Sequence, residues 1–405
     1  MFDTAYVSLN PASGRGLNSQ LLDCLEQLAS TGCGGQPVVG RILKLALFIH
    51  SRSHADFLAK RRQITAILKK FFQGNPPPLS VIAQSPEEGS DVVLYAEALL
   101  PEAGEAVLRY HLLAGIPYGT VQYQGHREVF GAGLTADSRF RGTPAQSTEA
   151  FRLMTQILTS ERLSVDNVVR QWNYVESILR LRPSASGKRQ NYQEFNDVRG
   201  RFYEECHFPA GFPAATGIGM AHGGVLIEFQ AVSSLGEFRV VPLSNPLQVD
   251  AHRYSQDALV GDRDRDDRLK APPLFERGKY LGRGGSGIIY ISGTAAVRGE
   301  ATSPEGDVES QTRITIANIQ SLISESNLSR HGIETVRPPG PLSYLRAYVK
   351  RRADLPAVKS VCRQIVGAAS AHYLTADICR DDLLVELEGV VPVKTRDSLF
   401  KGDVP

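Results

Sequence analysis

The chain has 405 residues, and its 45 Lys and Arg against 43 Asp and Glu give a formal net charge of +2. Hydrophobic residues make up 42% of the chain, a composition typical of globular proteins. This length suggests two or three domains, or one domain duplicated. The balanced charge removes the electrostatic argument for a dedicated nucleic-acid binder.

The N-terminal residues lack the basic region and apolar run of a secretory signal. The most apolar early stretch, residues 42–49, contains Lys44 and is far shorter than the roughly 20 residues that cross a bilayer. The five cysteines include no C-x-x-C spacing, which argues against a disulfide framework or a zinc knuckle. We therefore expect a cytoplasmic protein with no membrane segment, no metal and no cofactor.

In chain order, the first predicted element is a helix at 51–72, where apolar residues recur at helical spacing. The run Gly-Asn-Pro-Pro-Pro at 74–78 ends this helix. Residues 252–278 contain a charged insertion at 261–269, and this composition predicts a surface loop or linker. The polar tail after Val393 is expected to fray.

An internal repeat is the most informative feature of the sequence. The apolar run VLIEFQAV (225–232) matches LLVELEGV (383–390), and the amphipathic segment 146–158 matches 311–323. Each copy also has a further extended run and a second helix between these two segments. The repeat predicts two copies of an α+β unit, strand–strand–helix–strand–helix–strand, with two helices on one face of a mixed sheet.

A G-x-G-x-x-G motif occurs at Gly282, Gly284 and Gly287. A dinucleotide-binding loop needs a strand before this motif and a helix after it, but a strand-like run follows here. The kinase alternative needs V-A-I-K, H-R-D and D-F-G motifs, which the sequence lacks. The motif is therefore interpreted as an approach to a strand.

Two carboxylates stand two residues apart on the second apolar run, so Glu386 and Glu388 point to one face of a strand. On a half-buried face each would raise the pKa of the other, and a carboxyl that is protonated at neutral pH can act as a general acid. The first copy has Glu228 and Gln230 at these positions. A salt-bridged edge strand is the alternative.

Two further groups of residues suit an anionic ligand. Tyr192 and Arg199 share one face of a predicted helix, and a guanidinium can bind a carboxylate with two hydrogen bonds. Arg351 belongs to a basic cluster at the end of the central strand of the second copy. Solvated surface positions are the alternative for both.

These segments resemble a known family. Residues 292–323, with LRAYVKRRADLPAV and LLVELEGV, resemble the Rid/YjgF proteins, whose α+β units trimerise. A more specific resemblance, to the chorismatases, is carried by NYQEFNDVRGRFYEE and FPAATGIGM within 191–220, then by NPLQVDAHRY, PLFERG, ISGTA and LLVELEGV. It covers residues 107 to 392.

The resemblance implies an α+β fold of two diverged Rid-like (chorismate mutase-like) units, as a monomer or a homotrimer. The expected organisation is an N-terminal extension and helix at 1–80, a degenerate Rid-like domain at 81–240, a linker loop at 241–275, a Rid-like domain carrying the acid at 276–393 and a tail at 394–405.

The resemblance also implies that the substrate is chorismate, whose enol ether is protonated by Glu386 before the side chain leaves as pyruvate. Arg199 matches the family's F-N-x-x-R motif, and Tyr254, Lys270 and Arg351 fall where the family places further substrate-binding residues. Tyr192, on the face of Arg199, is a further candidate.

Members of the family differ in their products, which are a dihydroxycyclohexadiene carboxylate, 3-hydroxybenzoate or 4-hydroxybenzoate. Gly293 and Cys379 are similar to the 3-hydroxybenzoate-forming subgroup, and Cys379 is expected to take part in directing the product. A Rid-like imine deaminase or metabolite-binding protein is an alternative, although His372 stands where the deaminases have an arginine. A pure interaction module, with Glu386 structural, is a third hypothesis.

Overall fold

A computed structural model gives the fold of most of the chain. It describes residues 4–12, 16–33, 36–87, 89–100, 106–123, 125–184, 187–233, 238–262, 269–304, 306–366 and 370–396. Most of the charged insertion at 261–269 and the end of the predicted tail lie outside the described residues.

The middle unit (107–232) is a six-stranded sheet covered on one face by two helices. Its strands are β7 (Val107–Leu113), β8 (Ile116–Tyr123), β9 (His126–Thr135), β10 (Val168–Glu176), β13 (Ala214–Met220) and β14 (Val225–Val232), in the order β13-β10-β14-β9-β8-β7. Its helices are α3 (Gly142–Ser160) and α4 (Asn191–Tyr203), with a small hairpin of β11 (Leu181–Ser184) and β12 (Gly187–Gln190) before α4.

The C-terminal unit (239–394) repeats this order of elements. Its strands are β15 (Arg239–Leu243), β16 (Gly278–Arg283), β17 (Ser286–Ala295), β20 (Tyr344–Val349), β21 (Ser370–Thr375) and β22 (Val385–Lys394), in the order β21-β20-β22-β17-β16-β15. Its helices are α5 (Val308–Leu322), the short α6 (Glu325–Arg330) and α7 (Leu355–Val366), and a ribbon of β18 (Val297–Arg298) and β19 (Ala301–Thr302) follows β17.

Strand pairing confirms the predicted duplication. β10 pairs parallel with β13 and antiparallel with β14, and β20 pairs in the same way with β21 and β22. Each unit has two strands more than the repeat predicted: one more before the first helix, and one (β13 or β21) after the second. The α+β class is as expected, as are the two main helices of each unit; the C-terminal unit has the short α6 in addition.

A third sheet, which the sequence did not indicate, forms the N-terminal unit (4–99). Its elements are β1 (Thr4–Leu9), α1 (Leu17–Ser30), β4 (Ile42–Ile49), α2 (His54–Phe71), β5 (Leu79–Ile82) and β6 (Val92–Leu99), in the sheet order β5-β4-β6-β1, with a minor hairpin of β2 (Gly32–Cys33) and β3 (Gln36–Pro37). β4 pairs parallel with β5 and antiparallel with β6, so this unit repeats the other two without their first two strands.

The predicted helix at 51–72 is confirmed as α2. The Ser53 hydroxyl accepts a hydrogen bond from the backbone N–H of Asp56 at 3.1 Å, which caps the first turn. No helix in the described part of the chain is long and apolar enough to span a membrane. The apolar run at 42–49 is instead a strand, β4, that is buried on both faces.

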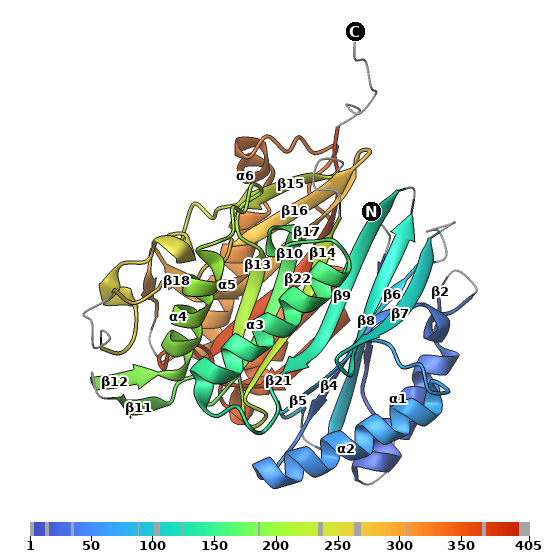
Figure 1. The fold of residues 1–405 in the computed structure, drawn as a ribbon. Helices are drawn as coiled ribbons and strands as arrows, with labels where there is room; N and C mark the ends of the chain where they lie inside the picture. Colours follow the sequence, from blue (N-terminus) through green and yellow to red (C-terminus); the bar gives the residue numbers. More distant parts are fainter. Residues whose placement is uncertain are drawn as a thin grey trace.

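The three sheets meet in a ring (Figure 1). β4 and β5 of the N-terminal unit contact β9, β13 of the middle unit contacts β17, and β21 of the C-terminal unit contacts β1. Each junction thus joins the outer parallel strand of one sheet to the strand before the first helix of the next. The helices cover the outer face of each sheet, on the side away from the interior where the three sheets meet.

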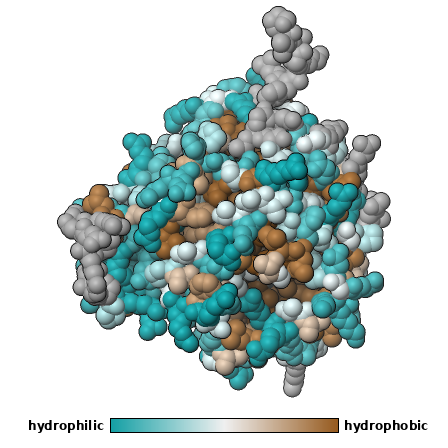
Figure 2. All heavy atoms as spheres, in the orientation of Figure 1, coloured by the Kyte–Doolittle hydropathy of each residue, from teal (hydrophilic) through white to brown (hydrophobic). Residues whose placement is uncertain are grey.

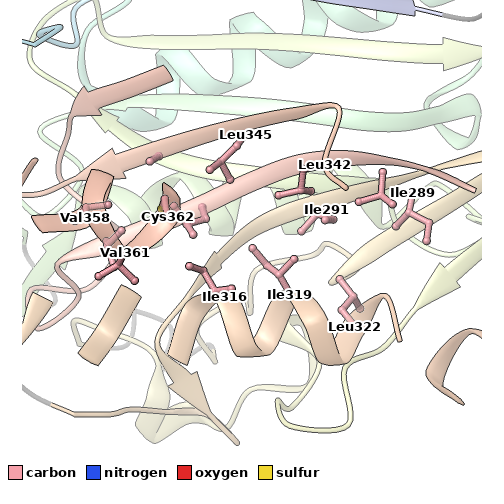
Figure 3. Close-up of a cluster of buried hydrophobic side chains, with 14 of the residues drawn as sticks. Ile289, Ile291, Ile316, Ile319, Leu322, Leu342, Leu345, Val358, Val361 and Cys362 are labelled. Carbon is pink, nitrogen blue, oxygen red and sulfur yellow. The ribbon is translucent and has the colours of Figure 1, made fainter. Parts of the chain in front are cut away.

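Ordinary apolar packing holds each sheet to its helices. In the C-terminal unit, Ile316, Ile319 and Leu322 of α5 pack against Ile289 and Ile291 of β17 (Figure 3). The outer surface in Figure 2 is mostly hydrophilic, with apolar side chains gathered near the centre of that view.

The G-x-G-x-x-G motif forms the tight turn between β16 and β17. Arg283 pairs with Ser286, and the two intervening residues, Gly284 and Gly285, have φ values of 58° and 77°. Two successive positive φ values suit a two-residue hairpin that continues the strand twist. The interpretation as an approach to a strand is confirmed.

Charged residues occupy the interior where the three sheets meet. Lys44, Arg170 and Arg346 stand at matching places on β4, β10 and β20, opposite Glu97, Gln230 and Glu388 on the neighbouring strands. All six side chains are buried. Buried charges must be paired to be tolerated, so this register already predicts an ion-pair network along the common interior.

Candidate active site

A pocket opens at the junction of β13 and β17, between the middle and C-terminal units. Gly217 and Ala215 of β13 and Gly293 and Ala295 of β17 line it, and α4 and the loop between β15 and β16 supply the other walls. The space between its walls, including the open mouth, is about 690 Å³. Glu386 of β22 lies in its wall.

Two features set the state of the Glu386 carboxyl. Burial first, and then the charge of Glu388, raise its pKa to about 8, so the group is largely protonated at neutral pH. Its Oε1 lies against Gly293, where an added Cβ would come within 2.1 Å of that oxygen. Glycine at this position therefore makes room for the carboxyl.

Glu388, two residues further along β22, has the opposite character. Although burial opposes ionisation, Arg346 and Arg170 lower its pKa, and their nitrogens lie 3.0 and 2.8 Å from its oxygens. The hydroxyl of Thr216 and the indole N–H of Trp172 also donate to it. The predicted carboxylate pair is thus divided into a protonated member in the pocket and an ionised member behind it.

Two arginines that the sequence analysis did not single out lie in the pocket wall. Arg277 donates to the Tyr254 hydroxyl at 2.7 Å, and its guanidinium carbon lies 5.4 Å from the centre of the Tyr254 ring. Arg380 lies 5.1 Å from the same ring and donates to the backbone oxygen of Glu300 at 2.6 Å. Both can present a cation to an anionic ligand.

Helix α4 lines the pocket through Tyr192 and Asn196. Burial, chiefly, raises the pKa of Tyr192, so its hydroxyl keeps its proton. Arg199, one turn further along, lies outside the pocket wall and donates to Asn196 at 2.7 Å. Arg199 can therefore act on a ligand through Asn196, and its charge also acts on Tyr192 in the pocket wall.

Cys379 lies in the pocket wall beside Glu386. Burial first, and the nearby Glu386, raise its pKa to about 12, so it is a neutral thiol rather than a thiolate. It can shape the pocket, but its ionisation state does not suit a nucleophile.

The structure places the remaining candidates outside the pocket wall. Lys270 donates to the backbone oxygens of Leu259 and Gly261 at 2.5 and 3.0 Å, so it fastens the loop that lines the mouth. Arg351 is exposed at the start of a short turn after β20. His372 is buried at the junction of β21 and β1, 3.1 Å from the Ser8 hydroxyl.

The middle unit also has a carboxylate, Glu228, at the position that corresponds to Glu386, but Glu228 does not line the pocket. Glu228 stands opposite Trp172 on the neighbouring strand, as Glu386 stands opposite Tyr348. Its oxygen lies 2.9 Å from the ammonium of Lys44, which also lies 3.2 Å from Glu97. The N-terminal unit therefore neutralises the counterpart of the acid.

Within the described residues, no three His, Cys, Asp or Glu side chains are grouped so that they could hold a metal ion. A buried, protonated carboxyl that lines the same pocket as guanidinium groups and tyrosines is suited to protonating a small anionic substrate.

Comparisons with known proteins identify the family. A family model described as chorismatase FkbO/Hyg5-like, N-terminal, matches residues 117–231. A protein of Streptomyces hygroscopicus named 3-hydroxybenzoate synthase is 38% identical over 252 residues, which cover 60% of this chain and 69% of the relative. A second protein of that organism, named chorismatase, is 34% identical over 281 residues, covering 69% and 76%. The chain belongs to the chorismatase family.

A solved structure supports the fold independently. A crystal structure of a chorismatase superposes with a TM-score of 0.67 at 23% identity, and the match covers 96% of this chain and 98% of the other. The N-terminal unit is included in a match of this extent.

Proposed function

We propose that this protein is a chorismatase that cleaves chorismate to 3-hydroxybenzoate and pyruvate. The observation that carries the proposal is the protonated Glu386 carboxyl in the wall of a pocket that also holds Arg277 and Arg380. The similarity to a protein named 3-hydroxybenzoate synthase supports the choice of product.

The chemistry begins with proton transfer from Glu386 to the methylene carbon of the enol ether. The proton makes an oxocarbenium ion. The bond between the ring carbon and the ether oxygen then breaks, its electrons stay on that oxygen as the keto group of pyruvate, and the substrate's own hydroxyl oxygen takes its place on the ring carbon. A general acid works best when its pKa lies near the working pH, and a carboxyl with a pKa of about 8 is protonated but not inert. The carboxylate left on Glu386 can take up the proton that the ring loses on aromatisation.

The two carboxylates of chorismate need cationic partners. Arg277 and Arg380 are the proposed partners because both guanidinium groups lie in the pocket wall and flank the Tyr254 ring. The proposed role of Arg199 is to hold Asn196 and α4 in place, and that of Lys270 is to hold the loop at the mouth. Arg351 remains a candidate only for the approach of the anionic substrate to the surface.

We expect Arg277→Gln to lower kcat/KM for chorismate by about 10- to 100-fold, mainly through KM, because a charge-assisted hydrogen bond is lost. Steady-state kinetics would measure the change. Arg363→Gln, at an exposed position on α7, serves as the control for loss of one positive charge. Equal effects of the two substitutions would contradict a specific role for Arg277.

We expect Cys379→Ala to increase the share of the hydrolytic product, the dihydroxycyclohexadiene carboxylate. The smaller side chain leaves room for water beside Glu386, and water then competes with the substrate's own hydroxyl for the cation. Chromatography of the products at equal conversion would measure the ratio. A ratio identical to that of the parent enzyme would remove Cys379 from product control.

The proposed function is tested by incubating the purified full chain with chorismate and separating the products. Formation of equal amounts of pyruvate and 3-hydroxybenzoate is expected. Absence of pyruvate would overturn the proposal. Pyruvate accompanied only by the diene product would support chorismate as the substrate but would contradict the proposed product, and would place the chain with the hydrolytic members of the family.

A further inference from the structure

Glu388 lies behind the pocket wall, where it is buried and has many hydrogen-bond and ion-pair partners. Its oxygens accept hydrogen bonds from side chains of three strands, β10, β13 and β20. The donors are Arg170 at 2.8 Å, Trp172 at 2.9 Å, Thr216 and Tyr348 at 3.4 Å, and Arg346 forms an ion pair with Glu388 at 3.0 Å. Two of these strands belong to the middle unit, so Glu388 ties the two walls of the pocket together.

We propose that Glu388 is a positioning residue for the acid step: its fixed negative charge, held at the junction of the two units, keeps the neighbouring Glu386 carboxyl protonated until substrate binds. This inference rests on the proposed function, since it assigns a role in the same proton transfer. Glu388 itself does not face the pocket and does not contact substrate in this scheme.

The charges around Glu386 support this role: burial is the first cause of its raised pKa, and Glu388 is the anion that adds to it. Arg170 and Arg277 act in the opposite direction. The other titratable groups in electrostatic contact with Glu386 are Cys379, Tyr192 and Tyr348, and burial raises the pKa of each of them above its ordinary value. These three are uncharged at neutral pH, so Glu388 supplies the nearby negative charge.

The cations around Glu388 are themselves fixed. Arg346 donates to the hydroxyls of Tyr344 and Tyr174 at 2.5 and 3.1 Å, and its guanidinium lies 4.8 Å from the Phe48 ring. Arg170 also donates to Thr216 at 2.8 Å, and the same Thr216 hydroxyl accepts from the backbone N–H of Gly293 at 3.1 Å. The glycine that makes room for Glu386 is therefore tied to the group that holds Glu388.

The middle unit provides a natural comparison. There the neighbour of the counterpart carboxylate is Gln230, a neutral residue that accepts from Tyr290 at 2.8 Å, and Glu228 itself is ion-paired with Lys44. Of the two pairs, Glu228 with Gln230 and Glu386 with Glu388, only the second combines a carboxyl without an ion-pair partner among the described residues with an ionised neighbour. The fold also accepts glutamine at this register opposite an arginine, because Gln230 faces Arg170.

The test is the pH profile of kcat/KM for Glu388→Gln. In the parent, the protonated acid is the active form, so kcat/KM should be level below pH 8 and fall as the pH rises through about 8. In Glu388→Gln the unbalanced Arg170 favours ionised Glu386, and the midpoint should move down by about one pH unit or more. For a shift of one unit the loss should be about fivefold at pH 8, approach about tenfold above pH 9 and be small at pH 6.

The matched control is Glu228→Gln, which removes another buried, ion-paired carboxylate from the corresponding strand of the middle unit. Its midpoint should equal that of the parent. A parent-like midpoint in Glu388→Gln, or an equal shift in both variants, would overturn the proposal.

A second measurement covers the case in which Glu388→Gln does not fold. Carboxyl ¹³C shifts of glutamate-labelled parent protein, with Glu386 assigned by its absence in Glu386→Gln, should show one buried glutamate that stays protonated at pH 7. A Glu386 carboxyl that is ionised at pH 7 would overturn the proposal even without the variant. Failure to cleave chorismate would reject the proposed function, whereas the NMR titration would still decide the state of the carboxyl pair.

Discussion

Replacing Glu386 by glutamine is expected to lower turnover of chorismate by about 100-fold or more, the contribution typical of a positioned general acid. The amide keeps the shape and the burial of the side chain but cannot release a proton to the enol ether. Because Glu386 is protonated at neutral pH, the substitution exchanges one neutral group for another, and folding should be little affected.

Rates of pyruvate release and the unfolding temperature of the parent and of Glu386→Gln would measure these effects. Glu228→Gln is the matched control, since Glu228 occupies the corresponding place in the middle unit and is paired with Lys44. If Glu386→Gln were nearly as active as the parent, Glu386 would not be the general acid, and another residue would have to donate the proton.

The second large effect is expected on stability, from Lys44→Met. The ammonium of Lys44 lies 2.9 Å from Glu228, 3.2 Å from Glu97 and 3.3 Å from the centre of the Trp172 ring, and only 1% of its side chain is exposed. Removing it leaves two buried carboxylates without their cation, so the free energy of unfolding should fall by about 3–5 kcal/mol.

Urea unfolding of Lys44→Met against the parent would measure this change. Lys359→Met is the control, because Lys359 pairs with Glu87 at the surface and such pairs contribute about 1 kcal/mol or less. An unchanged stability of Lys44→Met would show that the N-terminal unit is not joined to the middle unit by this pair.

Local patterns in the sequence were sufficient for the two larger units. The helices at 146–158 and 311–323 and the two apolar core strands have periods that depend only on the chain itself, and all are present in the structure. The same holds for the shared face of Glu386 and Glu388. The strand pattern alone did not distinguish the two carboxyls, because Arg170 and Arg346 come from other strands; only the family resemblance pointed to Glu386 as the acid.

The N-terminal sheet could not be predicted in the same way. It lacks the first two strands of the other units, and its central strand is interrupted by Lys44, whose partner Glu228 is 184 residues away. Arg277 and Arg380 escaped notice because they lie outside the helices and strands, where side-chain direction is set by tertiary contacts. The motif PLFERG, which contains Arg277, and the position of Arg380 next to Cys379 were the available signals.

The ring of three sheets has a consequence for how one site could specialise. In an assembly of identical subunits, any residue placed at one junction is repeated at every junction. Here a single polypeptide carries three related strands whose corresponding positions hold Tyr95, Glu228 and Glu386. Covalent linkage has released these positions from symmetry, so one is aromatic filling, one is an ion-pair partner and one is free to hold a reactive proton. A single fused chain can therefore hold three different residues at the three corresponding positions, whereas a homotrimer cannot.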